Sequence, residues 1–361
     1  MIDLFKVYVP EKLNSQLFEE ILKSGKLNSG FYVKQLEQEL VNFLGNPYVM
    51  VTSNNNYASL IALALCDLKN DDEVIASPMA CLASNQPVLN FGGKIVWADI
   101  DPSTGSLNPE DVKRKITSKT KVIIHYHWCG YPGYIDEINE IGLKNGIKVI
   151  DDGIESFGSI YKGKMIGNSG TDLTTFSFQT VRLPNSVDGG AISFASKEMY
   201  EKALRIRDYG IDRKTFRDDL GEISKLSDIN HLGYNAIMNE LNAYVGLQVI
   251  KDTSELIEKQ RSNAKLWDAY FYGKEPKPIG TRNEISPNYW VYSLLSDKME
   301  KELLSFREKE FYASKIHLRN DYYSSFGELD STLSGVNEFS SKQFSIPSGW
   351  WVNTINELAG C

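Results

Sequence analysis

The sequence predicts an α/β protein in which helices cover both faces of a mainly parallel sheet, followed by a smaller α+β domain. Between residues 48 and 194, short apolar runs alternate with segments whose apolar residues recur at helical spacing. From residue 257 onward, helices and short strands follow one another without that regular rhythm. We therefore expect a large domain over residues 1–248 and a small domain over residues 249–361.

The individual elements follow from apolar spacing and from the residues that stop each run. Helices are expected at residues 11–24, 33–44, 57–68, 82–91, 109–116, 135–145 and 240–256. Strands are expected at residues 48–52, 73–76, 94–98, 121–125, 148–150, 174–178 and 191–194. Ligands of such folds bind beyond the carboxyl ends of the strands. The site should therefore form at the junctions 52–56, 76–81, 126–133, 151–155 and 177–190.

Composition excludes several classes of function. The 47 acidic residues outnumber the 39 basic ones, giving a net charge of -8, so a nucleic-acid binder is not expected. The chain has no apolar run long enough to cross a membrane and no signal peptide, which makes the cytoplasm the expected location. We expect no metal, because no pair of cysteines or histidines has the spacing of a zinc site. We expect no disulfides either, since the cysteines are scattered, at Cys66, Cys81, Cys129 and Cys361.

Acidic and hydroxyl side chains end two of the predicted strands. Asp151 and Asp152 follow the apolar run 148–150, where a carboxylate either faces the ligand crevice or caps a helix. Ser177 ends another strand, where its hydroxyl either binds a phosphate or belongs to a plain loop. These residues alone do not decide between the two interpretations.

Three further polar groups are candidates. Residues 54–56 are all asparagine and precede a helix, whose N-terminus either binds an anion or is simply capped by them. His125 and His127 alternate at the end of a strand, so one should point to each side. His317 and Arg319 lie in a polar cluster that either grips a substrate or caps a helix.

Together, the motifs resemble the DegT/DnrJ/EryC1/StrS family of sugar-nucleotide aminotransferases. These are fold-type I enzymes that depend on pyridoxal phosphate (PLP), and the resemblance covers essentially the whole chain. The general motifs are a GDEVI-like run at 71–75, an EDAAQ-like run through Asp152 and Glu155, FSF at 176–178, DGG at 188–190 and a GYN-containing run at 233–243. A subgroup is matched by HWCGYP at 127–132, FSFQ at 176–179, HLRND at 317–321 and IPSGWW at 346–351.

The resemblance implies a role for each cofactor-binding residue. Asp152 should pair with the pyridine nitrogen of PLP. Ser177, with the N–H groups at Asn55 and Asn56, should hold the phosphate. Asn235 should reach that phosphate from the neighbouring subunit, which makes a homodimer with shared active sites the functional unit.

The remaining roles concern the ring and the substrates. Cys81, Glu155 and Gln179 should lie near the cofactor ring, and His317 and Arg319 should contact the substrate. The family converts a keto group on a nucleotide-linked sugar into an amine, usually with L-glutamate as the donor. The implied function is therefore a step in amino-sugar biosynthesis.

Arg182 departs from the pattern of the family. It lies four residues after Phe178, where the resemblance places the lysine that forms the Schiff base with PLP and moves a proton during catalysis. A guanidinium is a poor nucleophile and stays protonated at working pH. Any PLP or its amine form, pyridoxamine phosphate (PMP), should therefore be bound non-covalently. His127 or a water molecule would then have to serve as the base beside Arg182.

Three functions remain open from the sequence: an atypical aminotransferase, a PMP-dependent sugar dehydratase or lyase, and a catalytically inactive relative that binds a sugar nucleotide. The orientation of Arg182 should discriminate between them. If Arg182 points away from the cofactor and a histidine or tyrosine lies in its place, the protein is expected to be an enzyme. If Arg182 fills the cofactor space or pairs with Asp152, the site is closed to PLP.

Overall fold

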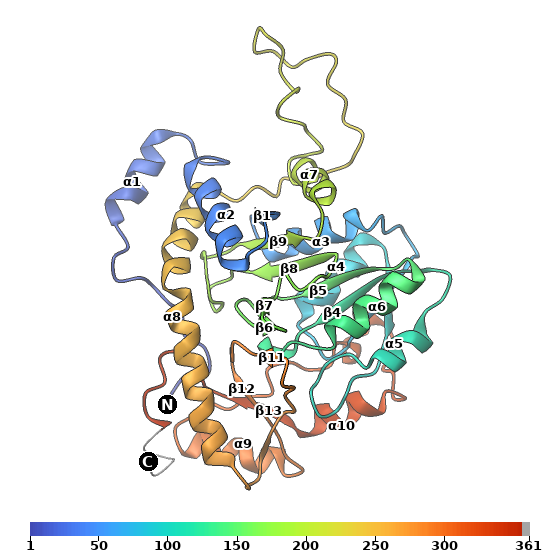
Figure 1. Cartoon of the computed structure of the whole chain (residues 1–361), viewed down its shortest axis with the longest axis vertical. Helices are drawn as coiled ribbons and strands as arrows, with labels where there is room; N and C mark the ends of the chain where they lie inside the picture. The colour runs from blue at the N-terminus through green and yellow to red at the C-terminus, as the bar shows by residue number, and fades with distance from the viewer. Residues whose placement is uncertain (356–361) are drawn as a thin grey trace.

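The computed structural model describes residues 1–355 and contains a mixed seven-stranded sheet at its centre (Figure 1). The strand order is β1-β9-β8-β5-β4-β2-β3. β9 runs antiparallel to both of its neighbours, and the strands from β8 to β3 are parallel. The strands span Val49–Thr52 (β1), Glu73–Ala76 (β2), Lys94–Trp97 (β3), Thr120–Tyr126 (β4), Lys148–Asp152 (β5), Leu173–Ser177 (β8) and Gly190–Phe194 (β9).

Helices cover both faces of this sheet, as the sequence predicts. One face packs against α3 (Asn55–Leu65), α4 (Leu82–Phe91) and α7 (Lys197–Ile206). The other packs against α2 (Phe31–Leu44), α5 (Pro109–Lys115), α6 (Ile135–Asn145) and α8 (Glu240–Phe271) (Figure 1). The short α1 (Ser15–Ser24) lies outside, against α8.

Capping residues define several helix ends. The Asn14 side chain accepts a hydrogen bond from Gln16 N–H at the start of α1, and Gly25 ends that helix with a φ of 66°. Asn54 caps α3 in the same way, by accepting from Tyr57 N–H at 3.0 Å. This cap places the N-terminus of α3 directly after the end of β1.

The C-terminal part forms a smaller α+β unit. Its antiparallel sheet has the order β10 (Lys277–Pro278), β12 (Tyr292–Leu295) and β13 (Gln343–Ile346). The helices α9 (Met299–Glu308) and α10 (Ser334–Lys342) pack beside it, and the short 3-10 helices η2 (Asn320–Tyr322) and η3 (Ser324–Phe326) connect them. Its core gathers aromatic rings, among them those of Trp267, Phe271, Phe306 and Phe344.

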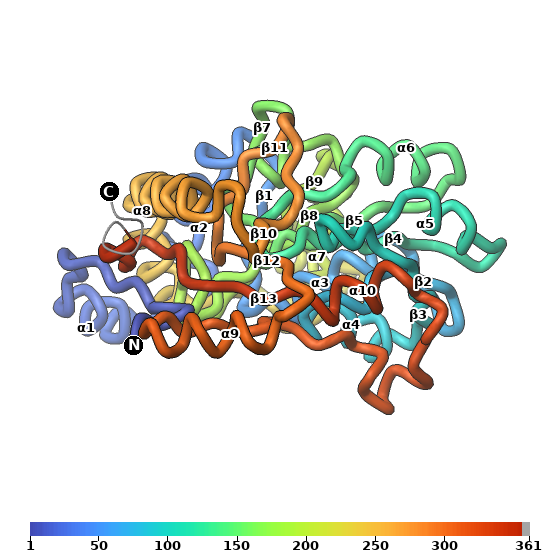
Figure 2. Tube along the Cα trace, turned by 90° about the horizontal axis from the view of Figure 1, so that it is seen from below, coloured from blue at the N-terminus to red at the C-terminus, as the bar shows by residue number. Residues whose placement is uncertain are grey.

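The domain boundary expected after residue 248 falls inside α8, which runs unbroken for 32 residues. The two parts are therefore joined by a helix rather than a linker. The N-terminus also packs on the C-terminal part, where Ile2 bridges Phe311 and Trp351 donates to the Asp3 carbonyl (Figure 2). The division into 1–248 and 249–361 remains a prediction.

The sequence analysis missed some elements. It did not anticipate α7, nor the small sheet formed by β6 (Ile160–Tyr161), β7 (Lys164–Met165) and β11 (Ile285–Ser286). It also missed a long excursion after α7, residues 209–232, which we call the arm (Figure 1). The arm projects from the body and exposes several large apolar side chains, those of Tyr209, Leu220, Ile223, Leu226, Ile229 and Leu232.

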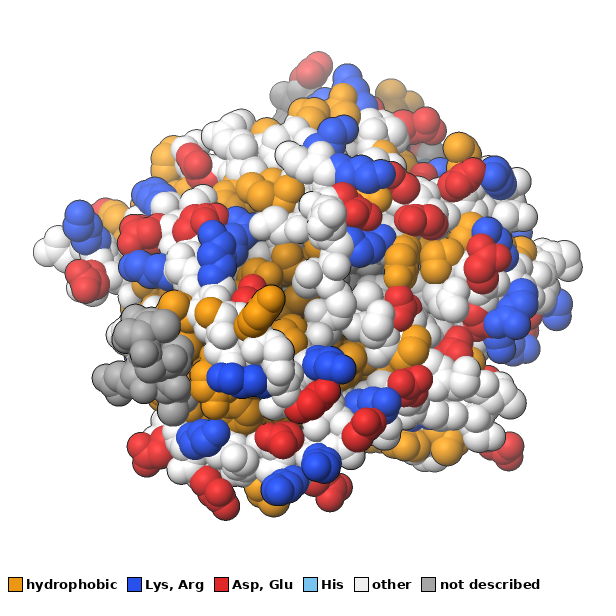
Figure 3. All heavy atoms as spheres, turned by 60° about the horizontal axis from the view of Figure 1, so that its bottom comes forward, with side chains coloured by type: hydrophobic (Ala, Val, Ile, Leu, Met, Phe, Trp, Pro, Cys, Tyr) orange, Lys and Arg blue, Asp and Glu red, His pale blue; other side chains and the backbone are white. Residues whose placement is uncertain are grey.

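The surface charge is mixed. Lysine and arginine side chains are interspersed with aspartate and glutamate over the face in Figure 3, and they form no single basic field. Among residues 1–355, no helix combines the length and apolar character that a membrane span requires.

Candidate active site

The strand register brings three sequence-distant segments together at one edge of the sheet. Gly190 pairs with Ser177 of β8 on one side and with Thr52 of β1 on the other. Ser177 thus lies across β9 from the loop that leads into α3. A side chain at position 190 would collide with this loop, because a Cβ there would lie 2.9 Å from backbone atoms of Asn54. This arrangement places the Ser177 hydroxyl near the helix N-terminus, a combination suited to an anion.

Four of the predicted cofactor-binding residues differ in exposure. Ser177 and Asn55 are buried, whereas Asn56 and Gln179 are exposed. The Oδ1 atom of Asn55 is buried and has no hydrogen-bond partner. As an acceptor, this oxygen requires a donor as its partner and would not itself bind a phosphate oxygen.

Asn235 is exposed and lies beside the same loop of its own chain. Its neighbour Ala236 accepts a hydrogen bond from Ser53 N–H at 2.8 Å, and Asn235 itself bridges Asp208. The contact of Asn235 with a neighbouring subunit remains a prediction.

Asp152 ends β5 and is buried, next to Tyr126 of β4 and Thr175 of β8 in the register. Its Oδ1 atom accepts from Ile154 N–H at 3.2 Å, and its Oδ2 atom makes no hydrogen bond. Burial raises the pKa of this carboxyl to about 6, although the nearby Ser84 hydroxyl and Ile154 N–H favour the ionised form. A buried carboxylate with an unused oxygen is suited to a positively charged donor.

Arg182 turns away from Asp152 and toward Trp290. Its guanidinium carbon lies 4.2 Å from the centre of the Trp290 ring, and Phe5 also stacks with that ring, at 4.4 Å. The Nη1 atom of Arg182 lies 3.1 Å from Glu155 Oε1. The guanidinium is thus held by a stacking contact and an ion pair, and its side chain is buried.

Glu155 is the centre of a buried polar cluster. Its Oε1 atom also lies 3.0 Å from His317 Nε2, while the Tyr126 hydroxyl donates to Oε2. Burial alone would raise the pKa of Glu155, but the charges of His317 and Arg182 outweigh it and lower the pKa to about 2. The carboxylate is therefore ionised throughout the neutral range.

Two cysteines lie beside this cluster. Burial raises the pKa of the Cys81 thiol to about 11, and it raises the pKa of Cys129 well above its usual value. Both thiols are therefore protonated at neutral pH and are poor nucleophiles. Cys361 lies outside the described residues.

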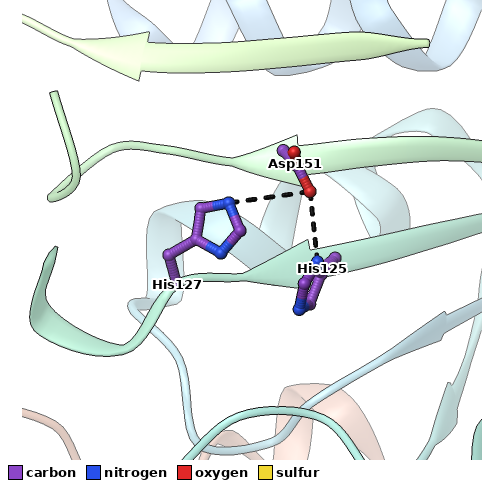
Figure 4. A group of neighbouring side chains, drawn as sticks. All are labelled: His125, His127 and Asp151. Carbon is purple, nitrogen blue, oxygen red and sulfur yellow. Dashed lines mark hydrogen bonds and ion pairs between the residues drawn. The ribbon is translucent and has the colours of Figure 1, made fainter. Parts of the chain in front are cut away.

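His127 belongs to a different cluster from Arg182. It lies with His125 and Asp151, and all three side chains are fully buried (Figure 4). The Nδ1 atom of His127 accepts from Gly133 N–H at 3.2 Å, so the proton of the neutral ring is on Nε2, which faces Asp151 Oδ1 at 3.6 Å. The expectation that His125 and His127 point to opposite sides was wrong, because residues two apart in a strand share a face, and both rings lie at Asp151. The role of His127 as a base remains a prediction.

The same geometry indicates why this cluster suits hydrogen bonding better than metal binding. A metal on His127 Nε2 would need the position that the proton occupies. Asp151 also accepts from His125 Nδ1 at 3.1 Å and from the Thr171 hydroxyl at 2.6 Å. Although burial alone would raise the pKa of Asp151, the two histidines hold it well below its usual range.

Arg319 is fully engaged within the protein. It makes a two-pronged ion pair with Asp321, at 2.7 and 2.6 Å, and it also donates to Asn337 and to the Asp330 carbonyl. The next residue, Asn320, is bonded to Ala80 and Asn85 at the end of β2 and in α4. The polar motif after His317 therefore anchors the small unit on the large one and holds His317 at Glu155.

Sequence reasoning missed Tyr126 and Trp290. Tyr126 had a usable signal, because alternation along β4 places it opposite to His125 and His127, on the side of Asp152. Trp290 had none, since its contact with Arg182 joins residues 108 positions apart in the sequence.

Comparisons with known proteins agree with the motifs. The DegT/DnrJ/EryC1/StrS aminotransferase family matches residues 10–353. The GDP-perosamine synthase of Escherichia coli O157:H7 is 27% identical over 303 residues, which cover 82% of this chain and 76% of that protein. A pleiotropic regulatory protein of Geobacillus stearothermophilus is 26% identical over 358 residues, covering 96% and 92%. The crystal structure of the sugar aminotransferase CalS13 from Micromonospora echinospora matches with a TM-score of 0.92 at 25% identity, covering 100% and 98%.

The chain therefore belongs to the DegT/DnrJ/EryC1/StrS aminotransferase family. Its fold is that of the fold-type I PLP-dependent transferases. The family and its solved neighbours are sugar aminotransferases that use PLP and PMP. A Streptococcus pneumoniae protein whose structures include PMP and PLP forms shares this fold with a TM-score of 0.88, at 20% identity.

Proposed function

We propose that this protein is an atypical sugar aminotransferase, which transfers an amine from L-glutamate to a keto-sugar nucleotide and holds its PLP or PMP non-covalently. The observation that carries the proposal is the orientation of Arg182. Its guanidinium is paired with Glu155 and stacked on Trp290, which leaves Asp152 without an ionic partner. Arg182 therefore does not form the pair with Asp152 that would close the site, which supports the proposal.

The described residues fit the cofactor at both of its ends. The free Oδ2 of Asp152 is a partner for a protonated ring nitrogen. Ser177 and the N–H groups at Asn55 and Asn56 form an anion site suited to the phosphate, and Gly190 leaves room for the loop that carries them. When bound, PLP acts as an electron sink for the carbon that loses a proton.

The protein's own residues would bind and orient the cofactor and the substrate, and they would move the proton. Asp152 would keep the ring nitrogen charged, and Cys81 with Glu155 would lie against the ring. Arg319 has its donors occupied by Asp321 and other internal partners, so we now assign it to positioning His317 rather than to direct substrate contact. The sugar and its nucleotide would enter on the side of His317.

We further propose that the arm forms part of a homodimer interface. Leu226 and Leu232 are 95% and 94% exposed in the single chain, which is unfavourable for isolated apolar side chains on a projecting loop. A second copy of the chain would bury them and would bring Asn235 into the shared site. A cytoplasmic location likewise remains a prediction.

A catalytically inactive, ligand-binding relative is the second candidate. The buried Arg182–Glu155 ion pair favours it, because a fixed guanidinium cannot replace the amine of a lysine. A PMP-dependent lyase has no feature of the described chain in its favour beyond the absence of a lysine at residue 182.

The Asp152→Asn variant tests the cofactor site. Removing the charge should weaken PLP binding by about 10- to 100-fold, as expected for the loss of a charge-assisted hydrogen bond. The measurement is an absorption titration with PLP, with the surface variant Asp67→Asn as a control that should bind like the wild type. Equal affinity in all three proteins would remove Asp152 from the cofactor site.

A further inference from the structure

Two of the groups around Glu155 share one of its oxygens. Arg182 Nη1 lies 3.1 Å from Oε1, and His317 Nε2 lies 3.0 Å from the same atom. The imidazole of His317 is thus held beside the guanidinium of Arg182, the residue that the sequence places at the lysine position. His317 lies 135 positions after Arg182 in the sequence, so it is the fold that brings the two side chains together.

The other polar groups of the cluster are unsuited to moving a proton near neutral pH. The guanidinium of Arg182 does not deprotonate. Burial raises the pKa of Tyr126, Cys81 and Cys129 above the neutral range, and Glu155 is held as a carboxylate by its neighbours. An imidazole is the side chain that normally exchanges protons in this range.

The hydrogen bonds of His317 leave one ring nitrogen available. In the neutral ring, the proton on Nε2 is donated to Glu155, and Nδ1 makes no hydrogen bond to any residue in the range 1–355. The side chain of His317 is 14% exposed, so it is not sealed in the core. A carboxylate that orients an imidazole through one nitrogen leaves the other as a base, the logic of a carboxylate–histidine dyad.

The ring is also firmly positioned. Asn320, three residues further on, is bonded to Ala80 and Asn85 of the large unit at 2.9 and 2.8 Å, and Arg319 is locked to Asp321. Trp128 packs edge-on against His317 with 6.0 Å between ring centres. Positioning of this kind is what proton transfer by a side chain requires.

We propose that His317, oriented by Glu155, is the group that moves the proton in place of the missing lysine. This inference rests on the proposed aminotransferase function and names the base for it. With L-glutamate joined to the cofactor through its amino nitrogen, the cofactor would supply the electron sink, and water would later release the keto acid. In that arrangement the free Nδ1 of His317 would accept the proton from the glutamate Cα, and the imidazolium would hold that proton and return it within the site. Arg182 keeps Glu155 ionised and takes no proton.

The test uses full-length wild type and the variants His317→Asn and His317→Gln, with PLP and L-glutamate as probes. Stopped-flow absorption follows conversion of PLP to PMP in a single turnover, and a separate titration gives the affinity for PLP. Both variants should convert PLP at least about 100-fold more slowly while PLP affinity changes less than about threefold. Added imidazole should restore part of the rate in His317→Asn. Leu318→Asn, an exposed neighbouring position, should behave like the wild type.

The outcomes separate the two proposals. Slow conversion with intact PLP affinity and imidazole rescue supports His317 as the base. A variant rate within about threefold of the wild type overturns this inference and leaves the aminotransferase function standing. Loss of PLP affinity beyond about tenfold in both variants assigns His317 a structural role and also overturns it. No conversion by the wild type removes the proposed function, and the inference with it.

Discussion

Arg182 and Glu155 form a buried ion pair. Trp290 contacts Arg182 and His317 contacts Glu155, and together these residues form the centre of the candidate site. Replacing lysine by arginine preserves the charge but changes the geometry and the chemistry. The planar guanidinium stacks on Trp290, which an ammonium group would do less well, and it holds Glu155 ionised. On the proposal that residue 182 occupies the lysine position of the family, Arg182 would organise neighbouring groups instead of forming a bond with the cofactor.

The Arg182→Lys variant tests this assignment. An amine at this place should form a covalent bond with PLP, because a neutral lysine is nucleophilic and the guanidinium is not. After borohydride reduction, mass spectrometry should detect one bound cofactor per chain. Wild type and the α7 control Arg205→Lys should show no such saturable adduct. Equal labelling of all three proteins would contradict the placement of residue 182 at the lysine position.

Glu155 predicts a pH dependence of stability. Its folded pKa is about 2 against an ordinary value of 4.5, so its ionised form stabilises the fold above pH 4.5. That contribution, on the order of 3 kcal/mol, is lost as the pH falls from about 4.5 to about 2. In Glu155→Gln, this part of the acid destabilisation should be absent.

Urea unfolding of the wild type and Glu155→Gln between pH 5 and 3 provides the measurement, with the exposed Glu137→Gln as the control. The unfolding free energy of Glu155→Gln should change less with pH than that of the control. Parallel pH profiles for the three proteins would show that Glu155 titrates normally in the fold.

Sequence reasoning named most residues of the candidate site but not how its central residues group together. Asp152 and Ser177 could be predicted because each ends an apolar strand, and such positions meet at one edge of a parallel sheet. The grouping of Arg182, Trp290 and His317 on Glu155 could not, since it depends on tertiary packing between distant segments. His125 and His127 were misplaced for a simpler reason: residues two apart in a strand share a face, so both rings lie on the side of Asp151 and not on opposite sides.

At the scale of elements, β9 approaches the loop before α3 closely, and this contact would form the phosphate end of the proposed site. Gly190 occupies the contact, where a Cβ would lie 2.8 Å from Thr52 Oγ1 and 2.9 Å from the Asn54 backbone. Backbone atoms cannot relieve a clash with an added Cβ by changing rotamer, as a flexible side chain can. The loop would have to move away from Ser177 to accommodate any larger residue.

The Gly190→Ala variant should therefore weaken PLP binding and lower the unfolding free energy by about 1–3 kcal/mol. Thermal unfolding and PLP titration measure the two effects. Gly280→Ala is a matched control, because the nearest atom to its Cβ lies at 3.3 Å and belongs to a surface loop far from Ser177. Unchanged PLP affinity in Gly190→Ala would argue that the loop does not hold the phosphate.

Elements with strong local signals were predicted well. The helices at 82–91 and 135–145 have the expected bounds, and every strand predicted in the large domain is present within a few residues. The continuity of α8 was not predicted, because aromatic residues near its end fit the small-domain core as well as a loop. Packing against the core of the small unit stabilises the helical form of this segment, and a local sequence pattern does not reveal such packing.

At the scale of the whole molecule, the arm suggests that the single chain is not the complete functional unit. The arm projects from the rest of the chain (Figure 1). Several of its large apolar side chains are exposed, and a concentration of exposed apolar surface is typical of an interaction site. A symmetric pair of chains would bury two arms at once.

The double variant Leu226→Asp, Leu232→Asp should shift the protein from dimer to monomer in sedimentation velocity experiments, because buried charges without partners oppose association. Leu143→Asp introduces the same charge at a position that is 85% exposed on α6, and it should leave the dimer intact. A monomeric wild type, or a dimer that survives the double variant, would contradict the role of the arm.

The most direct test of the central claim is an absorption spectrum of the purified wild-type protein titrated with PLP, before and after addition of L-glutamate. The protein should bind PLP saturably, and the bound PLP should show an aldehyde-type spectrum without a lysine adduct. L-glutamate should then convert this spectrum to that of PMP. PLP that binds but is not converted would favour the inactive relative or a PMP-dependent lyase. No saturable binding would contradict the assignment of Asp152, Ser177 and the α3 N-terminus as a cofactor site.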